Sequence, residues 1–178
     1  MIHATHEVQN QSTPLVDANL FSGNAALRDA LRFNHAGFDA ARFEALGAEM
    51  GSAAMQQHAR LANTFSPQLK GHDRFGHRID QVEFHPSYHA LMAAALRHGL
   101  HGTPWSAGPG AHVERAAAFM LFTECEPSVL CPVSMTYAVT PALRANPAIH
   151  AALGPGLASR HYDQRFVPMA QKTGLTLG

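Results

Sequence analysis

The chain is poor in lysine, cysteine and tryptophan, and these shortages limit the kinds of binding surface and site that it can form. Lysine occurs only at Lys70 and Lys172, and 13 basic side chains are balanced by 13 acidic ones. A nucleic-acid surface needs a basic face to neutralise phosphates, so we expect none in this chain. The two cysteines, Cys125 and Cys131, have neither zinc-site nor redox-pair spacing, which predicts free thiols in a reducing compartment.

Long apolar runs and a secretion signal are also lacking. The longest stretch without a charge, residues 127–143, is interrupted by Pro, Ser and Thr and does not predict a membrane span. The N-terminus has no charged region followed by an apolar one. These absences predict a cytoplasmic protein without a membrane partner. An apolar share of 46% in 178 residues is enough for one folded domain with its own core.

Apolar residues at spacings of three and four predict a mainly α fold of six to seven helices. Ser22 or Asn24 is expected to cap the first helix, and Ser52 the third. Pro86 suits the first turn of a helix that ends at Gly99. The expected helices cover residues 22–33, 39–50, 52–66, 86–99, 111–124, 132–140 and 147–153.

Several residues are expected to interrupt this pattern. Gly47 and Gly51 weaken the end of the second helix, Pro141 ends the sixth, and residues 154–156 (Gly-Pro-Gly) end the seventh. Residues 69–84 predict a small β-hairpin with turn residues at Asp73 and Gly76, resting on helices because a lone hairpin is marginally stable. In the helix over 111–124, one face is expected to pack inward: Val113, Ala116, Ala117, Met120 and Leu121.

Thirteen histidines make metal binding an alternative to weigh. His85 and His89 stand four apart at a helix start, and a third ligand would have to come from His98 or His101. The pair lacks the glutamate of a metalloprotease motif, so we favour His85 as a helix cap and His89 as a partner for a neighbour. No nucleophile elbow or phosphate-binding glycine loop is present either.

The helix expected from Pro132 mixes hydroxyl residues into an otherwise apolar face. One interpretation is a buried helix whose Ser and Thr side chains bond back to the preceding turn. The other is that one flank lines an apolar pocket. The residues alone leave both open.

Several motifs together resemble the acyl-CoA dehydrogenase superfamily, in particular its alkylation-response (AidB-like) branch. They are Thr5-His-x-Val-x-Asn-Gln11, Phe84-His-Pro-x-Tyr-His89, Leu130-Cys-Pro-Val-Ser-Met-Thr136, Arg160-His-Tyr-Asp163 and Gln171-Lys-x-Gly174. Tyr88 departs from the tryptophan expected at its position. The resemblance covers nearly the whole chain, and it rests on the order and spacing of the motifs.

The resemblance implies a protein with FAD and an acyl-CoA or related small substrate, which assembles as a tetramer. This chain would be its acyl-CoA dehydrogenase N-terminal-like helical domain, with a wall of the acyl and flavin pocket formed by Leu130, Cys131, Met135 and Thr136. The flavin-binding loop and the catalytic glutamate would lie beyond residue 178. We therefore expect no catalytic, cofactor-binding or metal residue here, and neither activity nor bound FAD in the chain by itself.

The domain organisation follows the same expectation. Residues 1–20 would form an extended arm, residues 21–170 the helical domain, and residues 171–178 the first strand of a truncated middle β-domain. Residues 174–178 alternate small or polar with apolar residues, which is typical of a strand. The missing flavin and C-terminal domains would be its partners. The alternative is a stand-alone helical binding or interaction module without catalysis.

Overall fold

The computed structural model describes residues 5–178, which form seven α-helices and one β-hairpin. The predicted mainly α fold is therefore confirmed. The helices are α1 (Ala25–Asn34), α2 (Ala40–Gly51), α3 (Ala53–Thr64), α4 (Pro86–Arg97), α5 (Ala111–Cys125), α6 (Leu130–Ala142) and α7 (Pro147–Ala158). The strands are β1 (Gln68–His72) and β2 (Arg78–Glu83), and the short 3-10 turns are η1 (Thr103–Ser106), η2 (Leu143–Ala145) and η3 (Met169–Gln171).

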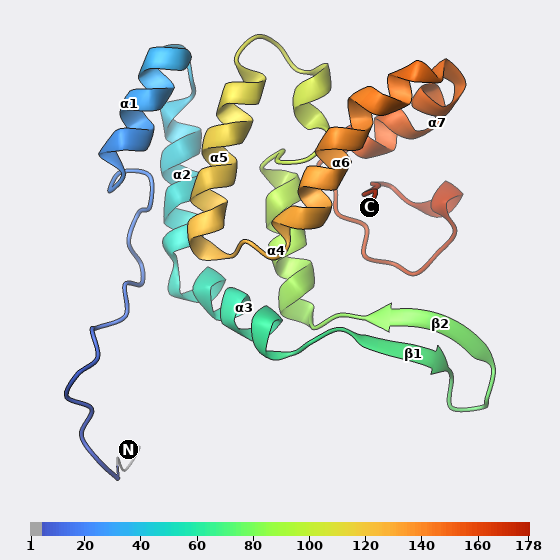
Figure 1. Ribbon diagram of the computed structural model, residues 1–178, viewed down its shortest axis with the longest axis horizontal. Coiled ribbons are helices and arrows are strands. Elements are labelled where there is room, and N and C mark those ends of the chain that lie inside the picture. The colour runs from blue at the N-terminus through green and yellow to red at the C-terminus, as the bar shows by residue number, and fades with distance from the viewer. Residues whose placement is uncertain (1–4) are drawn as a thin grey trace.

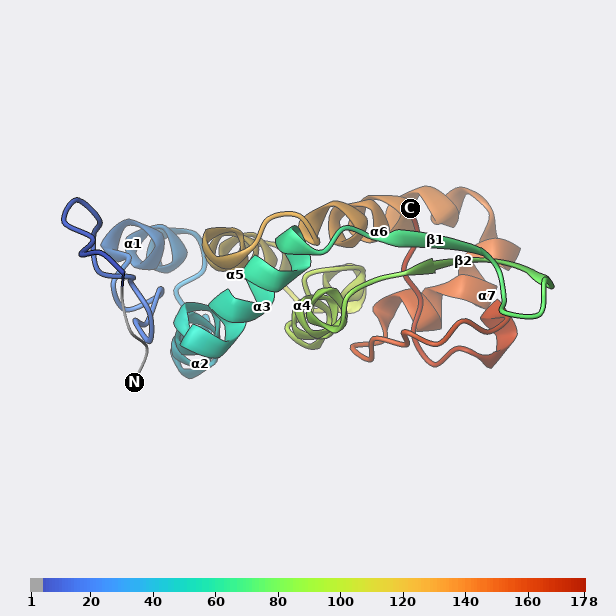
Figure 2. The same ribbon diagram turned by 90° about the horizontal axis from the view of Figure 1, so that it is seen from below.

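The helices form two layers with the core between them. Figure 1 shows α2, α5, α4 and α6 side by side, and Figure 2 shows α1, α5 and α6 in one layer over α2, α4 and α7. Among residues 5–178, no helix has both the length and the apolar character needed to cross a bilayer. The largest fully buried side chains come from both layers and include Phe43, Leu91, Leu96, Leu121 and Phe122.

Side-chain caps begin three helices at residues that the sequence predicted. The Asn24 side chain accepts a hydrogen bond from the Leu27 amide, which decides between the two predicted caps of α1. Ser52 caps α3 as predicted. His85 Nδ1 accepts from the Ser87 amide, so the interpretation of His85 as a cap is confirmed. These bonds satisfy amide groups that have no partner within the helix.

Gly47 and Gly51 let the N-terminal segment lie directly on α2. The Asp17 amide donates to the Gly51 carbonyl at 2.8 Å, and the Leu20 amide donates to the Gly47 carbonyl at 3.1 Å. A Cβ atom on Gly51 would stand 1.7 Å from the Ala18 oxygen, and one on Gly47 2.3 Å from Asn19 Oδ1. The two glycines thus do more than weaken the helix, because only they allow this contact. Residues 5–14 extend away from the helices (Figure 1).

Three boundary predictions are wrong, and all involve proline. α6 begins at Leu130 instead of Pro132, because Pro132 then falls in the first turn, where its missing N–H has no acceptor anyway. Pro141 lies inside the last turn of α6, so the helix runs on to Ala142. α7 continues through Pro155 to Ala158. Burial of Leu157 explains this extension, since tertiary packing offsets the one lost backbone hydrogen bond.

The predicted inward face of α5 is wrong at two positions. Ala117 and Leu121 are buried, whereas Met120 is 57% exposed. Ala116 is exposed as well. The helix packs against α1 and α2 along a narrower stripe than the spacing suggested.

The hairpin has the predicted turn but projects from the helices. Asp73 accepts hydrogen bonds from the amides of Phe75 and His77, and Gly76 has a φ of 88°. Leu69 pairs with Val82, yet Leu69 is 72% exposed, so the expectation that the hairpin rests on helices is wrong. Only its base is anchored, where Phe65 stacks on His85 at 4.8 Å.

Replacing Gly51 by alanine should destabilise the chain even though alanine is the better helix former. The new methyl group would collide with the Ala18 carbonyl, at a cost of about 1–3 kcal/mol that exceeds the helical gain of about 1 kcal/mol. Urea unfolding of residues 1–178 measures the difference. Gly71→Ala is the control, because a Cβ there meets no atom within 4 Å. An equal effect of the two changes would contradict the close contact.

Candidate pocket wall on α6

α6 divides its residues sharply between the core and the solvent. Leu130, Val133, Thr136 and Thr140 are buried. The hydroxyl of Thr136 donates to the Pro132 carbonyl and that of Thr140 to the Thr136 carbonyl, both at 2.8 Å. The predicted back-bonding of hydroxyls to the preceding turn is therefore confirmed for both threonines, and it lets these polar groups be buried at little cost.

The four residues predicted to line a pocket do not share one face. Leu130 and Thr136 point into the domain and are at most 4% exposed. Cys131 and Met135 point outward, and Met135 is 46% exposed. Cys131, Met135 and the exposed Ala138 repeat at spacings of four and three, so they form one uncharged strip along the helix, here called the α6 strip. The sequence pattern located the helix but not this division.

The C-terminal segment, residues 159–178, crosses α6 beside this strip. Thr136 Oγ1 accepts a hydrogen bond from the Leu177 amide at 3.0 Å. A Cβ on Gly178 would lie 3.8 Å from the sulfur of Met135. Residues 172–178 contain no assigned strand, and no partner strand lies beside them among residues 5–178. The strand predicted over residues 171–178 thus stays a prediction.

Asp163 organises the C-terminal segment, a role that the sequence did not reveal. Its carboxylate accepts from Arg165 Nε at 2.8 Å and from the Thr173 amide at 3.0 Å. Lys172 Nζ donates to its backbone carbonyl at 2.9 Å. These donors, led by the Arg165 guanidinium, hold the pKa of Asp163 well below its usual range. The segment is thereby closed into a loop around one ionised carboxylate.

His101 anchors the start of the same segment from inside the core. It is fully buried, and its Nε2 donates to the Ser159 carbonyl at 2.8 Å. Its Nδ1 has no hydrogen-bond partner among residues 5–178. Burial lowers the pKa of His101, and the nearby cations Arg160 and Arg115 act in the same direction. His101 is therefore neutral at pH 7, and protonating it would place an unpaired charge in the core.

Tyr137 belongs to an aromatic cluster and not to the exposed strip. Its ring lies 5.1 Å from the Trp105 ring, and the Arg115 guanidinium carbon lies 3.8 Å above it. His112 Nδ1 is 2.8 Å from the Tyr137 hydroxyl. Trp105 Nε1 donates to the Tyr137 carbonyl at 2.8 Å, which ties the loop before α5 to α6. The apolar surface of α6 is thus confined to the side of Cys131 and Met135.

The histidines weighed as metal ligands have separate partners. His85 caps α4, and His89 Nδ1 lies 2.9 Å from the Tyr162 hydroxyl, as predicted for a neighbour. His98 pairs with Glu49 at 2.7 Å. Within residues 5–178, no three His, Cys, Asp or Glu side chains are grouped so that they could hold a metal ion.

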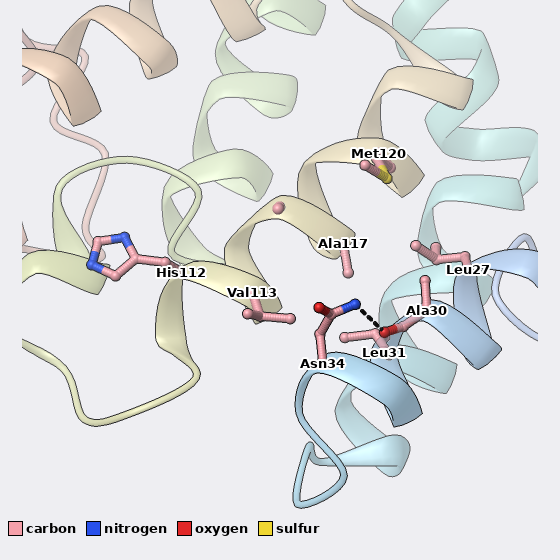
Figure 3. Close-up of a pocket in the computed structure, with 9 residues that line it drawn as sticks. Leu27, Ala30, Leu31, Asn34, His112, Val113, Ala117 and Met120 are labelled. Atoms are coloured by element: carbon pink, nitrogen blue, oxygen red, sulfur yellow. Dashed lines mark hydrogen bonds between the residues drawn. The ribbon is translucent and has the colours of Figure 1, made fainter.

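A separate apolar groove lies between α1 and α5, with a volume of about 370 Å³. Figure 3 shows Leu27, Leu31, Val113 and Met120 facing into it, and the Asn34 amide turned back to the Ala30 carbonyl at 2.8 Å. The groove contains no acidic or basic side chain apart from His112. Its lining offers burial of apolar groups but no reactive centre.

Comparison with known protein families shows to which family this chain belongs. The family model of the adaptive response protein AidB N-terminal domain matches residues 10–164. The chain belongs to the AidB N-terminal domain family. The resemblance inferred from Leu130–Thr136 and the other motifs is thereby confirmed. The chain is also 40% identical over 177 residues to the putative acyl-CoA dehydrogenase AidB of Escherichia coli, covering 98% of this chain and 33% of that protein.

Solved structures share the fold of this AidB N-terminal domain. The apo form of Bd2924 superposes on 86% of the chain with a TM-score of 0.74 at 24% identity, and the chain covers 32% of it. The complex of Caenorhabditis elegans ACDH-11 with C11-CoA covers 89% of the chain with a TM-score of 0.67 at 19% identity, and the chain covers 29% of it. The chain thus spans about a third of the length of each relative.

Replacing Thr136 by valine should release the C-terminal segment of this AidB domain from α6. The substitution keeps the shape but removes the acceptor of the Leu177 amide, at a cost of about 1 kcal/mol. Amide hydrogen exchange at Leu177 should therefore accelerate. Thr140→Val is the matched control, because that buried hydroxyl bonds only within α6. Unchanged exchange at Leu177 in the Thr136 variant would show that the contact does not hold the segment.

The buried His101 should make stability decline in mild acid. Its pKa in the folded chain lies below the value of 6.5 for the free side chain, so the unfolded state binds more protons once the pH falls below 6.5. Stability is then full above that pH and is lost below it. His101→Gln keeps a donor for the Ser159 carbonyl but cannot titrate. Denaturation between about pH 7 and 5 should show a flatter dependence for this variant, and parallel curves would contradict the assignment.

Proposed function

We propose that this chain is the N-terminal helical domain of a longer FAD-dependent acyl-CoA dehydrogenase-like oxidoreductase of the DNA-alkylation-response type. Membership in the AidB N-terminal domain family supports the proposal, as does a length of one third of the E. coli relative. The observation that carries it is the α6 strip, an uncharged surface beside which the last residue of the chain lies. Such a surface suits one wall of an acyl and flavin pocket.

The residues of the strip are suited to line a pocket, but they lack the groups needed to bind the cofactor. Cys131 and Met135 offer a thiol and a thioether, which suit contact with an alkyl chain or an apolar ring edge. The one hydroxyl nearby, on Thr136, is already bonded to Pro132 and Leu177. No positive side chain belongs to the strip to hold a phosphate. The groups that hold FAD would therefore come from other domains.

The task of this domain would be to shape the pocket and keep water out. When bound, FAD would accept the hydride removed from the β-carbon of an acyl thioester, while a glutamate outside this chain takes the α-proton. Met135 would limit the space for the acyl chain, and the buried Leu130 and Thr136 would fix the position of the strip. The water-poor wall would strengthen the electrostatic interactions made by other domains.

The whole protein would contain further domains. Residues 171–178 would enter the first strand of a middle β-domain, and that domain and a C-terminal helical domain would be the partners of this one. The complete protein would be a cytoplasmic tetramer. Residues 1–178 alone would neither retain FAD nor catalyse, because the base and most cofactor contacts would be missing.

A bulky residue in the strip tests this role in the longer protein. Met135→Trp should shorten the acyl chains that are accepted and slow reduction of the flavin by a long-chain acyl-CoA by about tenfold or more. Ile149→Trp is the control, because Ile149 is exposed to a similar degree (44%) but lies on α7. Flavin absorbance and its bleaching by acyl-CoA of several lengths provide the measurement. Equal effects of both changes would reject the pocket wall, and absence of flavin from the longer protein would reject the flavoenzyme assignment.

A further inference from the structure

An open groove of about 710 Å³ lies on the side of α4 away from the buried helix face. Its first wall is one face of α4, formed by Pro86, His89, Ala90 and Ala93. Its second wall belongs to the C-terminal segment and consists of Tyr162, Gln164 and Arg165. The volume falls within the range of about 300–1,000 Å³ that is typical of small-molecule sites. The α6 strip contributes no residue to it.

His89 lines this groove, and within residues 5–178 only one of its two ring nitrogens has a hydrogen-bond partner. Tyr162 lies 2.9 Å from His89 Nδ1, and its hydroxyl has no other acceptor among residues 5–178. We assign the tautomer in which the phenol, the stronger acid of the two groups, donates to Nδ1, so that the proton of the neutral imidazole is on Nε2. Burial keeps both groups uncharged, because it lowers the pKa of His89 and raises that of Tyr162. The Nε2–H group itself bonds to nothing within the described chain.

Arg165 adds a cation whose position is fixed. Its Nε and Nη2 donate to the buried Asp163 carboxylate at 2.8 and 2.6 Å, and Nη2 also donates to the Gln171 carbonyl. Within residues 5–178, Nη1 has no hydrogen-bond partner. Asp163 is ionised and its charge offsets that of Arg165, so Arg165 offers an anion a directed N–H donor at Nη1 and not a net positive charge. The lining contains no acidic side chain.

We propose that this groove binds a linear carboxylate with an apolar tail. The carboxylate would accept hydrogen bonds from His89 Nε2 and Arg165 Nη1, and the tail would lie along Pro86, Ala90 and Ala93. A free imidazole donor and one guanidinium donor match the two oxygens of a carboxylate. A phosphate dianion would need more positive charge than the single cation in the lining provides. The site is independent of the function proposed for α6.

A titration of residues 1–178 with octanoate tests this site directly. Amide NMR signals of residues 89–93 and 164–165 should shift and saturate with a Kd of about 1 mM or tighter. Octanol, which has the tail without the charge, should bind at least about tenfold more weakly. Octyl phosphate should bind no more tightly than octanoate.

Two substitutions test separately how the apolar tail and the charge of the ligand contribute to binding. Ala93→Leu fills the groove and should weaken octanoate binding by about tenfold, whereas Ala116→Leu, in the α1–α5 groove, should change it by less than about twofold. Gln164→Glu places a negative charge at an exposed position of the rim. It should weaken octanoate binding by about fivefold and leave octanol binding unchanged.

The opposite results would overturn the proposal. Octanoate shifts that do not saturate by about 10 mM, or that map to the α1–α5 groove, would show that the site takes no such ligand. Equal affinity for octanol and octanoate would mean that the groove binds the apolar tail and does not recognise the carboxylate. Tighter binding of octyl phosphate than of octanoate would mean that the groove recognises a phosphate and not a carboxylate. Because Gln164 is exposed, its variant keeps the test valid even if Ala93→Leu fails to fold.

Discussion

The burial of α4 is the constraint on which the rest of this domain depends. Leu91, Ala95 and Leu96 have no exposed surface, and the helix packs against both α3 and α6. α6 must therefore turn its Leu130, Val133 and Thr136 side inward, which leaves Cys131 and Met135 at the surface. The less buried side of α4, with His89 and Ala93, faces the C-terminal segment instead. Both candidate surfaces thus follow from how one apolar helix is covered.

The C-terminal segment is held mainly by polar contacts, in contrast to the helices. His101 fixes its start, Asp163 closes its middle, and Thr136 holds the Leu177 amide near its end. Hydrogen bonds have directional requirements that apolar contacts lack, so they define the path of a segment without regular secondary structure. This path brings Gly178 beside Met135 and Tyr162 beside His89. A change in one of the three anchors would therefore shift the C-terminal segment where it lies beside the strip or the groove.

Local chemistry made much of this fold predictable. Short polar side chains before apolar stripes located the starts of α1 and α3, and Asp73 with Gly76 located the hairpin turn, because caps and turns depend on a few neighbouring atoms. Pro141 and Pro155 misled the prediction, since packing of the surrounding helices outweighs a single missing amide bond. The orientation of Met135 and Thr136, the contact of Gly51 with Ala18, and the role of Asp163 depend on segments distant in sequence. Periodicity within one helix carries no information about them.

The reactivity of Cys131 tests most directly whether the α6 strip is covered in the intact protein. Cys131 is exposed, whereas burial raises the pKa of the Cys125 thiol to about 11, so a thiol reagent at neutral pH reports on Cys131. We predict rapid modification in residues 1–178 and modification at least about tenfold slower in the longer protein with bound flavin. Equal rates in the two proteins would mean that the strip faces solvent in both. It would then not be a wall of the flavin and acyl pocket.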